Sequence, residues 1–171
     1  VTITINGTND VPVVDAVSPT AELTEAVDAD ADTNAGQVQT LNTVGTVDVT
    51  DVDVDDVLTG STTAAATAEW NGADFSGDAR FADLIAQAAL TFDAPVTSDG
   101  TQQTLNFTYN VADADLNFLG EGDVVELTFP IQVADNEGGV NSVAQTVTIT
   151  INGTNDVPVV DAVSPTAELT E

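Results

Sequence analysis

The 171-residue chain contains no cysteine and no histidine. Without thiolate or imidazole ligands, zinc and copper are poor candidates for a bound metal. Every catalytic arrangement that depends on cysteine or histidine is also excluded. Because there are no cysteines, any stabilisation beyond the hydrophobic core must come from something other than disulfides.

Positive charge is almost absent as well. Arg80 is the only Lys or Arg against 29 Asp and Glu, which gives a formal net charge of -28. This charge excludes nucleic acid as a partner and argues against direct contact with an anionic membrane. A compact chain of this charge repels itself, so it needs high salt or bound cations to fold firmly. A salt-adapted acidic surface and the binding of multivalent cations both satisfy that need, and the two are compatible.

One stretch of sequence occurs twice without a mismatch. VTITINGTNDVPVVDAVSPTAELTE covers Val1–Glu25 and returns at Val147–Glu171, with the two copies offset by 146 residues. We interpret the chain as one period of a tandem array plus an overhang. Residues 1–10 are then the tail of a preceding unit and its linker, 11–156 form one unit, and 157–171 begin the next. Adjacent identical repeats are the expected partners. No signal peptide and no membrane-spanning run is present, and an internal piece of an array would have neither.

Alternation of apolar and polar residues predicts several short β-strands. The expected strands are Val1–Ile5, Ala21–Glu25, Thr43–Val52, Ala64–Trp70, Ala88–Phe92, Leu105–Val111, Val125–Val133 and Val143–Ile151. Strands of this length between regular turns indicate an antiparallel β-sandwich. Pro130 predicts that its strand is an edge strand or carries a bulge. Asp78–Ala88 has apolar residues at helical spacing and is expected to form one short helix, capped by Ser76 or Asp78.

The inward faces of these strands give a predicted core. It contains Val47, Val49, Leu105, Phe107, Leu127, Phe129, Ile131, Val147 and Ile149. The duplicated ends cannot both occupy their native places in one domain. We therefore expect one copy of Val1–Ile5 and Val147–Ile151, and one copy of Val13–Glu25 and Val159–Glu171, to be frayed, projecting or packed on another molecule.

Acidic residues gather where these strands end. Calcium takes six to eight oxygen ligands from carboxylates, amides and carbonyls, and such ligands must converge from well-held loops. The candidates are Asp10, Glu25, Asp51, Asp53, Glu121, Asp123, Asp135 and Asp156. Asp51 and Asp53 lie on the same face of one strand, where a cation would relieve their repulsion, so calcium is favoured there. Asp135 considered alone is better interpreted as a turn-forming residue.

Other acids remain open. Asp28, Asp30, Asp32 and Asn34 alternate as in the start of an EF-hand loop, but Thr33 replaces the loop glycine and Gln39 the closing Glu. This segment is either a further calcium site or a solvated acidic loop. The acids left without an assignment are Asp55, Asp56, Asp113 and Asp115.

The order of several motifs resembles cadherin repeats, and more closely the bacterial cadherin-like repeats of the VCBS type found in giant RTX-class adhesins. The motifs are GTNDVP, then Glu25, TDVD at Thr50–Asp53, VAD at Val133–Asp135, and FLGEGDVVELTFPIQVADNEGG followed by VTITINGTND. The match covers most of residues 9–156 and is weakest at Ser61–Gly100. It implies an Ig-like, cadherin-like sandwich with calcium held at the joints between units.

The resemblance also assigns ligands to two joints. Asn9, Asp51, Asp53 and Asp135 would form one site. Glu25, Glu121 or Asp123, and Asp156 would form the other, while Asp10 and Asn155 would serve neighbouring units. The linker departs from the cadherin pattern, because Gly or Thr stands where cadherins have an Asp before the Asn-Asp pair, and Val stands at the second Asn. The glutamate turn is GEGD.

The function that follows is structural: a calcium-stabilised extender that holds an adhesive tip away from a bacterial surface. A spacer needs length and stiffness, which near-identical repeats supply. The alternative is a ligand-binding module, for carbohydrate or for another copy, with Trp70 and Tyr109 as the available platforms besides six Phe. An enzyme is not expected. We expect an extracellular protein whose isolated fragment is monomeric.

Overall fold

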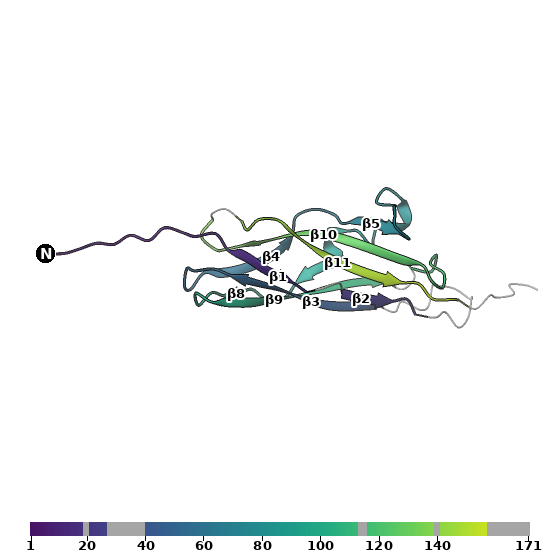
Figure 1. Ribbon diagram of the computed structural model, residues 1–171, viewed down its shortest axis with the longest axis horizontal. Coiled ribbons are helices and arrows are strands. Elements are labelled where there is room, and N and C mark those ends of the chain that lie inside the picture. The colour runs from purple at the N-terminus through teal and green to yellow at the C-terminus, as the bar shows by residue number, and fades with distance from the viewer. Residues whose placement is uncertain (19–20, 27–39, 113–115, 139–140, 157–171) are drawn as a thin grey trace, which may run out of the picture.

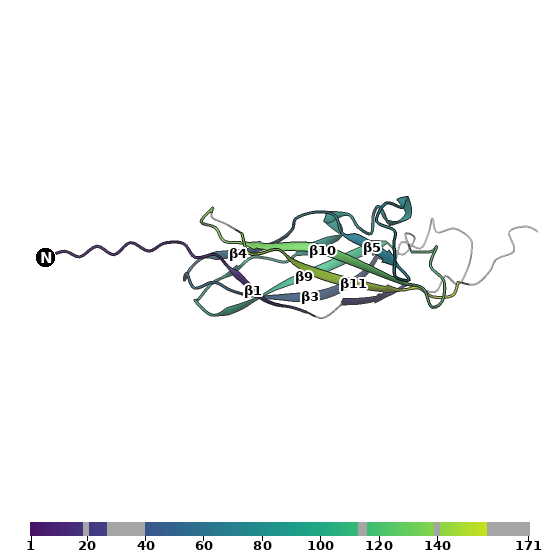
Figure 2. The ribbon, with the colours of Figure 1, turned by 45° about the horizontal axis from the view of Figure 1, so that its top comes forward.

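Two β-sheets face each other along the length of the molecule (Figures 1 and 2). The computed structural model describes residues 1–18, 21–26, 40–112, 116–138 and 141–156. The first sheet has the strand order β1 (Val13–Val17), β3 (Thr40–Thr50), β9 (Gln102–Ala112) and β7 (Leu90–Phe92). The second has the order β2 (Ala21–Thr24), β11 (Gln145–Asn152), β10 (Val124–Ala134), β4 (Val57–Thr62) and β8 (Val96–Thr97), and β5 (Thr67–Trp70) pairs with both β10 and β6 (Ala73–Asp74). The chain therefore forms the predicted Ig-like β-sandwich.

The long strands follow the period-2 pattern of their sequences. In β10, each inward residue from Val125 to Val133 is buried and the residues between them face out. The same alternation fixes the pairing of β3 with β9, in which Val47 lies opposite Leu105 and Val49 opposite Gln103. A shift of one residue would turn the apolar faces of these strands into solvent, so the pattern itself specifies the register.

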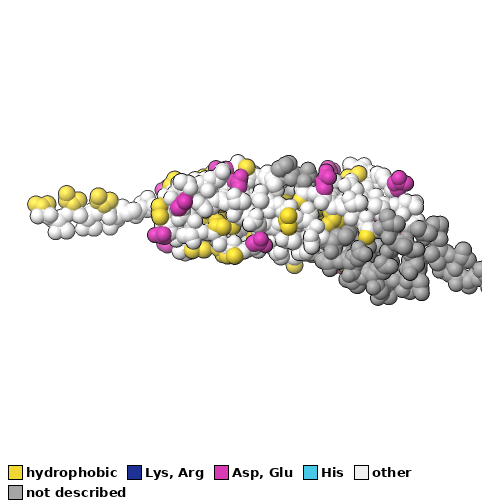
Figure 3. Space-filling view, turned by 90° about the horizontal axis from the view of Figure 1, so that it is seen from below, with side chains coloured by type: hydrophobic (Ala, Val, Ile, Leu, Met, Phe, Trp, Pro, Cys, Tyr) yellow, Lys and Arg dark blue, Asp and Glu magenta, His cyan; other side chains and the backbone are white. Residues whose placement is uncertain are grey.

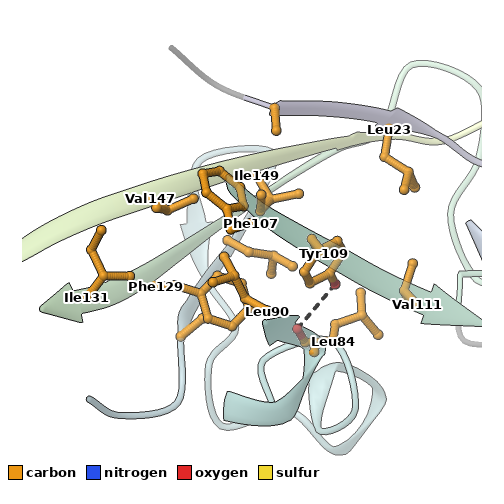
Figure 4. Packing of buried hydrophobic residues seen from close by; sticks show 14 of the residues in the cluster. Leu23, Leu84, Leu90, Phe107, Tyr109, Val111, Phe129, Ile131, Val147 and Ile149 are labelled. Carbon is orange, nitrogen blue, oxygen red and sulfur yellow. Dashed lines mark hydrogen bonds between the residues drawn. The ribbon is translucent and has the colours of Figure 1, made fainter. Parts of the chain in front are cut away.

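The predicted core is confirmed. All nine predicted residues are at most 1% exposed. Figure 4 shows Phe107 and Tyr109 from β9 packed against Phe129 and Ile149 from the opposite sheet, and the Tyr109 hydroxyl donates a hydrogen bond to the Leu84 carbonyl at 3.2 Å. Interdigitated side chains from both sheets thus hold the strand ends at fixed positions.

The predicted helix at Asp78–Ala88 is wrong. The described residues contain only the 3₁₀ turns η1 (Ala79–Phe81) and η2 (Gln87–Ala89) in this region. Asp78 does cap the first turn, because its carboxylate accepts a hydrogen bond from the Arg80 amide at 3.0 Å. Of the apolar residues at helical spacing, Phe81 and Leu84 are buried and Ile85 is half-buried, but Ala88 is exposed and Ala89 is buried in its place. A segment this short does not recover the cost of nucleating an α-helix, and it closes as separate turns.

Pro130 does not mark an edge strand. β10 lies inside its sheet, with β11 on one side and β4 and β5 on the other. The Pro130 carbonyl accepts a hydrogen bond from the Thr63 amide at 2.9 Å, at the point where the chain leaves β4 and before it returns as β5. The missing N–H of proline therefore faces a break between two neighbouring strands, where no ladder partner is required.

The first strands divide between the two sheets. β1 pairs with β3 in the first sheet, and β2 pairs with β11 in the second. The β2–β11 pairing is parallel, whereas the other strand pairs of the described residues are antiparallel. One short segment of chain thus closes both sheets on the same edge of the sandwich.

The two copies of the duplicated segment occupy different environments. Val1–Ile5 forms no strand and projects from one end of the sandwich, with Val1, Ile3 and Ile5 exposed (Figure 1). The identical residues Val147–Ile151 lie in β11, with Val147, Ile149 and Ile151 buried. One of these two copies projects, as expected. Val159–Glu171 lies outside the described residues, so the second half of that expectation stays a prediction.

Replacing Phe129 with Ala tests the core. The Phe129 side chain is fully buried, so its removal leaves a cavity and is expected to lower the free energy of unfolding by about 3–5 kcal/mol. Thr128→Ala, on the outward face of the same strand, should cost less than about 1 kcal/mol. Urea denaturation of both variants makes the comparison, and equal losses would contradict the assignment of the two faces.

Candidate metal centre

Three carboxylates meet at one end of the sandwich. The N-terminal segment projects from this end, which we call the leading end (Figure 1). Asp51 follows β3 directly, and Asp53 and Asp56 lie in the loop between β3 and β4. Each of the three offers an oxygen, and these oxygens all lie within 4.8 Å of one another. The structure thus brings together the predicted ligands Asp51 and Asp53, and it adds Asp56. We call these three side chains the carboxylate cluster.

Asp56 is the residue that sequence reasoning missed. It joins the cluster because Asp55 has a φ of +76°, a left-handed conformation that reverses the chain and returns the next residue toward Asp51. Asp and Asn adopt this conformation more readily than other residues with a Cβ. The two adjacent acids Asp55 and Asp56 are visible in the sequence. The turn at Asp55, which places Asp56 and not Asp55 in the cluster, is not.

The cluster contains buried oxygens without hydrogen-bond partners. Asp51 is 1% exposed and Asp56 8% exposed, and the Oδ2 atom of each has no hydrogen-bond donor. The other oxygen of Asp51 accepts a hydrogen bond from the Asp53 amide at 3.0 Å. A buried carboxylate oxygen without a partner is costly, and a nearby like charge adds to the cost. A bound cation would offset both costs.

The pKa of Asp56 also shows that its charged form is unfavourable here. Burial raises the pKa of Asp56 above its ordinary value, and the negative charges of Asp51, Glu137, Asp53 and Asp135 raise it further. In the absence of a cation, the neighbours therefore disfavour the charged form of this carboxyl.

A buried serine on another loop holds the cluster in place. Ser98, between β8 and β9, is 2% exposed. Its hydroxyl donates to the Asp51 carbonyl at 2.8 Å, its amide donates to the Asp56 carbonyl at 2.8 Å, and its carbonyl accepts from the Asp55 amide at 2.9 Å. These three bonds fix both ends of the acidic loop, so the carboxylates stay close despite their charge.

The leading linker lies against the same loops. The Asn9 side-chain amide donates to an Asp135 carboxylate oxygen at 3.1 Å, and the Asp10 backbone amide donates to Asp53 at 2.6 Å. A hollow of about 270 Å³ remains between the linker and the acids, and it is lined by Gly7, Thr8, Asn9, Asp53, Val54, Asp56 and Glu137. The structure therefore places Asn9 and Asp135, which the resemblance assigned to this joint, beside the cluster, together with Asp10, which it assigned to a neighbouring unit. Metal binding by these three residues stays a prediction.

The donor set suits calcium. The cluster offers one carboxylate oxygen from each of its three Asp and no nitrogen or sulfur ligand, which is the chemistry of a hard cation such as Ca²⁺. Asp51, Asp53 and Asp56 would hold the ion. Asp51 and Asp56 each have a buried carboxylate oxygen without a hydrogen-bond partner, which the ion would satisfy. When bound, the ion would supply positive charge that the chain itself lacks, whereas the loops and Ser98 keep the ligands converged.

The remaining predicted ligands lie at the opposite, trailing end, where β11 leaves the sandwich (Figure 2). Glu25 is 2% exposed, and its carboxylate accepts a hydrogen bond from the Thr154 amide at 2.9 Å. Asp123 accepts from the Gly120 amide and then from the Asn71 side chain, and these bonds lower the pKa of Asp123. Both carboxylates bind backbone or amide donors around the turn that carries Gly120.

The other trailing residues are more open. Glu121 is exposed, and the Asn155 side-chain amide donates to the Asp156 carbonyl at 3.1 Å. Within the described part of the chain, no group of three carboxylates converges at this end. Calcium binding here by Glu25, Glu121 or Asp123, and Asp156 stays a prediction. The proposed loop at Asp28–Asn34, as well as Asp113 and Asp115, lies outside the described residues.

The aromatic side chains do not form an open platform. Tyr109 is fully buried. Trp70 packs edge-on against Phe75 and Phe118, at ring-centre distances of 5.3 and 5.5 Å, and the Arg80 guanidinium lies 5.0 Å from its ring centre. These side chains occupy the stacking surface of Trp70, so the aromatic residues do not support carbohydrate binding, whereas binding of another copy stays a prediction.

No family model matches this chain, and neither does any curated protein. Among solved structures, the chain is distantly similar to AggA, the major subunit of aggregative adherence fimbriae type I from Escherichia coli, with 12% identity over 88% of this chain and 100% of that one, at a TM-score of 0.44. It is also similar to the CooA pilin subunit of enterotoxigenic Escherichia coli, with 14% identity over 85% and 99% of the two chains and a TM-score of 0.36.

A further similarity is to a PapD-like domain of human CEP192, with 9% identity over 91% and 93% of the two chains and a TM-score of 0.41. The described residues contain no helix long and apolar enough to cross a membrane. At these identities and TM-scores the similarities carry no argument about function, which has to be argued from the chain itself.

Calcium titration tests the carboxylate cluster. We expect the chain to bind Ca²⁺ with a dissociation constant of about 10⁻⁴–10⁻³ M, as extracellular calcium modules do. The double substitution Asp51→Asn with Asp53→Asn should abolish binding at this site. The matched control Asp83→Asn with Asp93→Asn removes the same charge from exposed positions and should leave it intact. Isothermal titration calorimetry distinguishes the cases, and equal heats from both double variants would refute the ligand assignment.

Asp56→Asn should have opposite effects with and without the ion. In chelator it removes a buried like charge, so we expect the melting temperature to rise, and with calcium it removes a ligand, so the calcium-induced rise should shrink. Asp55→Asn is the control, because Asp55 is exposed and Asn tolerates its positive φ. Thermal melts of both variants, with calcium and with chelator, make the measurement.

The rise in melting temperature that we expect for Asp56→Asn in chelator should also depend on pH. Since the pKa of Asp56 is raised in the folded state, its protonated form contributes stability that is complete below the unfolded pKa and lost as pH rises through the folded pKa. The difference between the variant and the original chain should therefore shrink as the solution is acidified through that range. A difference that stays constant with pH would show that charge is not its cause.

Proposed function

We propose that this chain is a calcium-stabilised extender repeat of a bacterial cell-surface adhesin. The observation that carries the proposal is the docking of the Asn9–Asp10 linker on loops that hold the carboxylate cluster, in which Asp51 and Asp56 each have a buried oxygen without a hydrogen-bond partner. An ion bound there would touch both the domain end and the chain that enters it. A site built this way links a domain to its neighbour, and an enzyme would need no such arrangement.

The exact duplication supports a tandem array. The repeated 25 residues contain most of β11, the linker and the first two strands of the following unit, so they span one whole joint. Val1–Ile5, which projects here, has the sequence of a buried strand of the same fold. We infer that in the array this segment completes the preceding unit. Repeats that stack only on their neighbours give a long structure from one kind of part.

Calcium would act on stiffness and on stability together. Without the ion, the leading-end acids repel one another and the linker is held by two hydrogen bonds. With the ion, the carboxylates gain a partner and the unit is stabilised by mass action. Extracellular calcium is plentiful, so a site of millimolar strength is sufficient outside a cell and stays largely empty inside. The array would thus be flexible before secretion and stiff at the bacterial surface, where it would project an adhesive tip.

Small-angle scattering of a chain with several tandem repeats tests this function. Calcium should lengthen the maximum dimension relative to chelator and raise the melting temperature, because the same ions would fix the joints and stabilise the units. The Asp51→Asn, Asp53→Asn substitution in every repeat should remove the calcium-dependent part of both effects. If neither quantity responds to calcium in the unsubstituted array, the proposed function is wrong.

A further inference from the structure

The linker is seen attached to both ends of the same sandwich. Residues 8–10 have the same sequence as residues 154–156, so Thr8 corresponds to Thr154, Asn9 to Asn155 and Asp10 to Asp156. The first copy shows how the linker enters a unit, and the second shows how it leaves one. Together the two views describe one joint of the proposed array, on which this inference rests.

At the trailing end the chain is fixed as far as Thr154. The Gly153 amide donates to the Asp123 carbonyl at 2.9 Å, and the Thr154 amide donates to the Glu25 carboxylate at 2.9 Å. A Cβ on Gly153 would lie 2.5 Å from the Gly120 carbonyl oxygen, so the linker backbone lies directly against the turn and only glycine fits. Each residue from the end of β11 to Thr154 is therefore bound to its own unit.

At the leading end the chain is fixed from Asn9 onward. The Asn9 side chain binds Asp135, the Asp10 amide binds Asp53, and Pro12 is buried. In the numbering of the trailing copy, these contacts begin at Asn155. Thr154 is thus held by one unit, and the residue that follows it in sequence is held, in its leading copy Asn9, by the next.

We propose that the joint between repeats contains no free residue, so that the trailing end of one repeat abuts the leading end of the next. The Thr154 amide is bound to one unit and the amide of Asp156, in its leading copy Asp10, is bound to the next, so only Asn155 lies between them, and its leading copy Asn9 is held through its side chain. Successive Cα atoms are about 3.8 Å apart, so the two ends are in contact range. The interaction partner of the leading end is a second copy of this repeat.

The surface of the leading end suits such a neighbour. Apart from the projecting segment and Val44, the large exposed apolar residues of the described chain lie at or near this end, and they are Val11, Val13, Val52, Val54, Val57 and Val143. Val52 and Val54 are more than half exposed and flank the acids of the cluster. Acidic and apolar side chains accordingly lie side by side at the end from which the N-terminal segment projects (Figure 3). The preceding repeat, held there by a linker without slack, would cover them.

A chain of two repeats in chelator tests the joint without calcium. The protein has no cysteine, so Ala88→Cys in each repeat gives two exposed spin-label positions, and electron–electron resonance measures their distance distribution. Inserting two glycines between Thr154 and Asn155 should broaden this distribution about twofold, because it adds flexible residues where there were none. The same insertion after Gly77, an exposed turn, should leave the width unchanged. An original chain as broad as the linker insertion would overturn the proposal.

Two substitutions of Glu25 separate this inference from the role of calcium. Glu25→Gln keeps an oxygen that can accept from the Thr154 amide, whereas Glu25→Ala removes it. In chelator, only Glu25→Ala should broaden the distribution, and equal widths for the two variants would contradict the clamp. Because calcium is absent, failure of the proposed calcium response leaves these results unaffected. Calcium is expected to narrow the distribution of the original chain further, by fixing the torsions between Thr154 and Asn155, and only a chelator width equal to that of the linker insertion would refute the abutting joint.

Discussion

The structure depends on how a chain with a single basic side chain holds buried carboxylates close together. Arg80 is the only Lys or Arg, and it forms an ion pair with Asp78 at 2.8 Å while lying over Trp70 and Phe118, outside the leading-end loops. No basic side chain is left for the carboxylate cluster. Unless the solution supplies a cation, the repulsion there has to be opposed by the sandwich core and by the bonds of Ser98. The packed core thus keeps the mutually repelling carboxylates of the cluster in position.

The predictable part of the fold is the part that alternation specifies. β3, β9, β10 and β11 have long period-2 patterns, and one face of each is buried as the patterns predict. β4 could not be found in this way, because of its residues Val57–Thr62 only Leu58 is buried. The segment after Asp78 has helical spacing but forms only 3₁₀ turns, since its length and its contacts with Trp70 decide the backbone. Pro130 was misread because the break between β4 and β5 is a property of the sheet and not of its own strand.

The candidate site was predictable to the same limited degree. Asp51 and Asp53 are visible in the sequence as two acids at a spacing of two, but the prediction that they share a strand face was wrong, because β3 ends at Thr50 and both residues lie in the loop after it. Asp56 depends on the positive φ of Asp55, and Ser98 is distant in sequence and identified only by its bonds to the acidic loop. Sequence reasoning therefore found the candidate ligands that lie at the end of a predicted strand. It missed Asp56, which a turn brings back, and Ser98, which holds the acidic loop from a neighbouring loop.

The two ends of the unit use their acids differently, and this difference bears on how a joint works. At the trailing end, Glu25 and Asp123 accept hydrogen bonds that hold the linker and its supporting turn. At the leading end, Asp51 and Asp56 retain buried oxygens without donors. A cation at the leading end would therefore stabilise the fold, because it would satisfy buried oxygens of Asp51 and Asp56 that have no hydrogen-bond donor. Directional hydrogen bonds set the path of the linker at one end, and ion binding at the other end would then have few torsions left to fix.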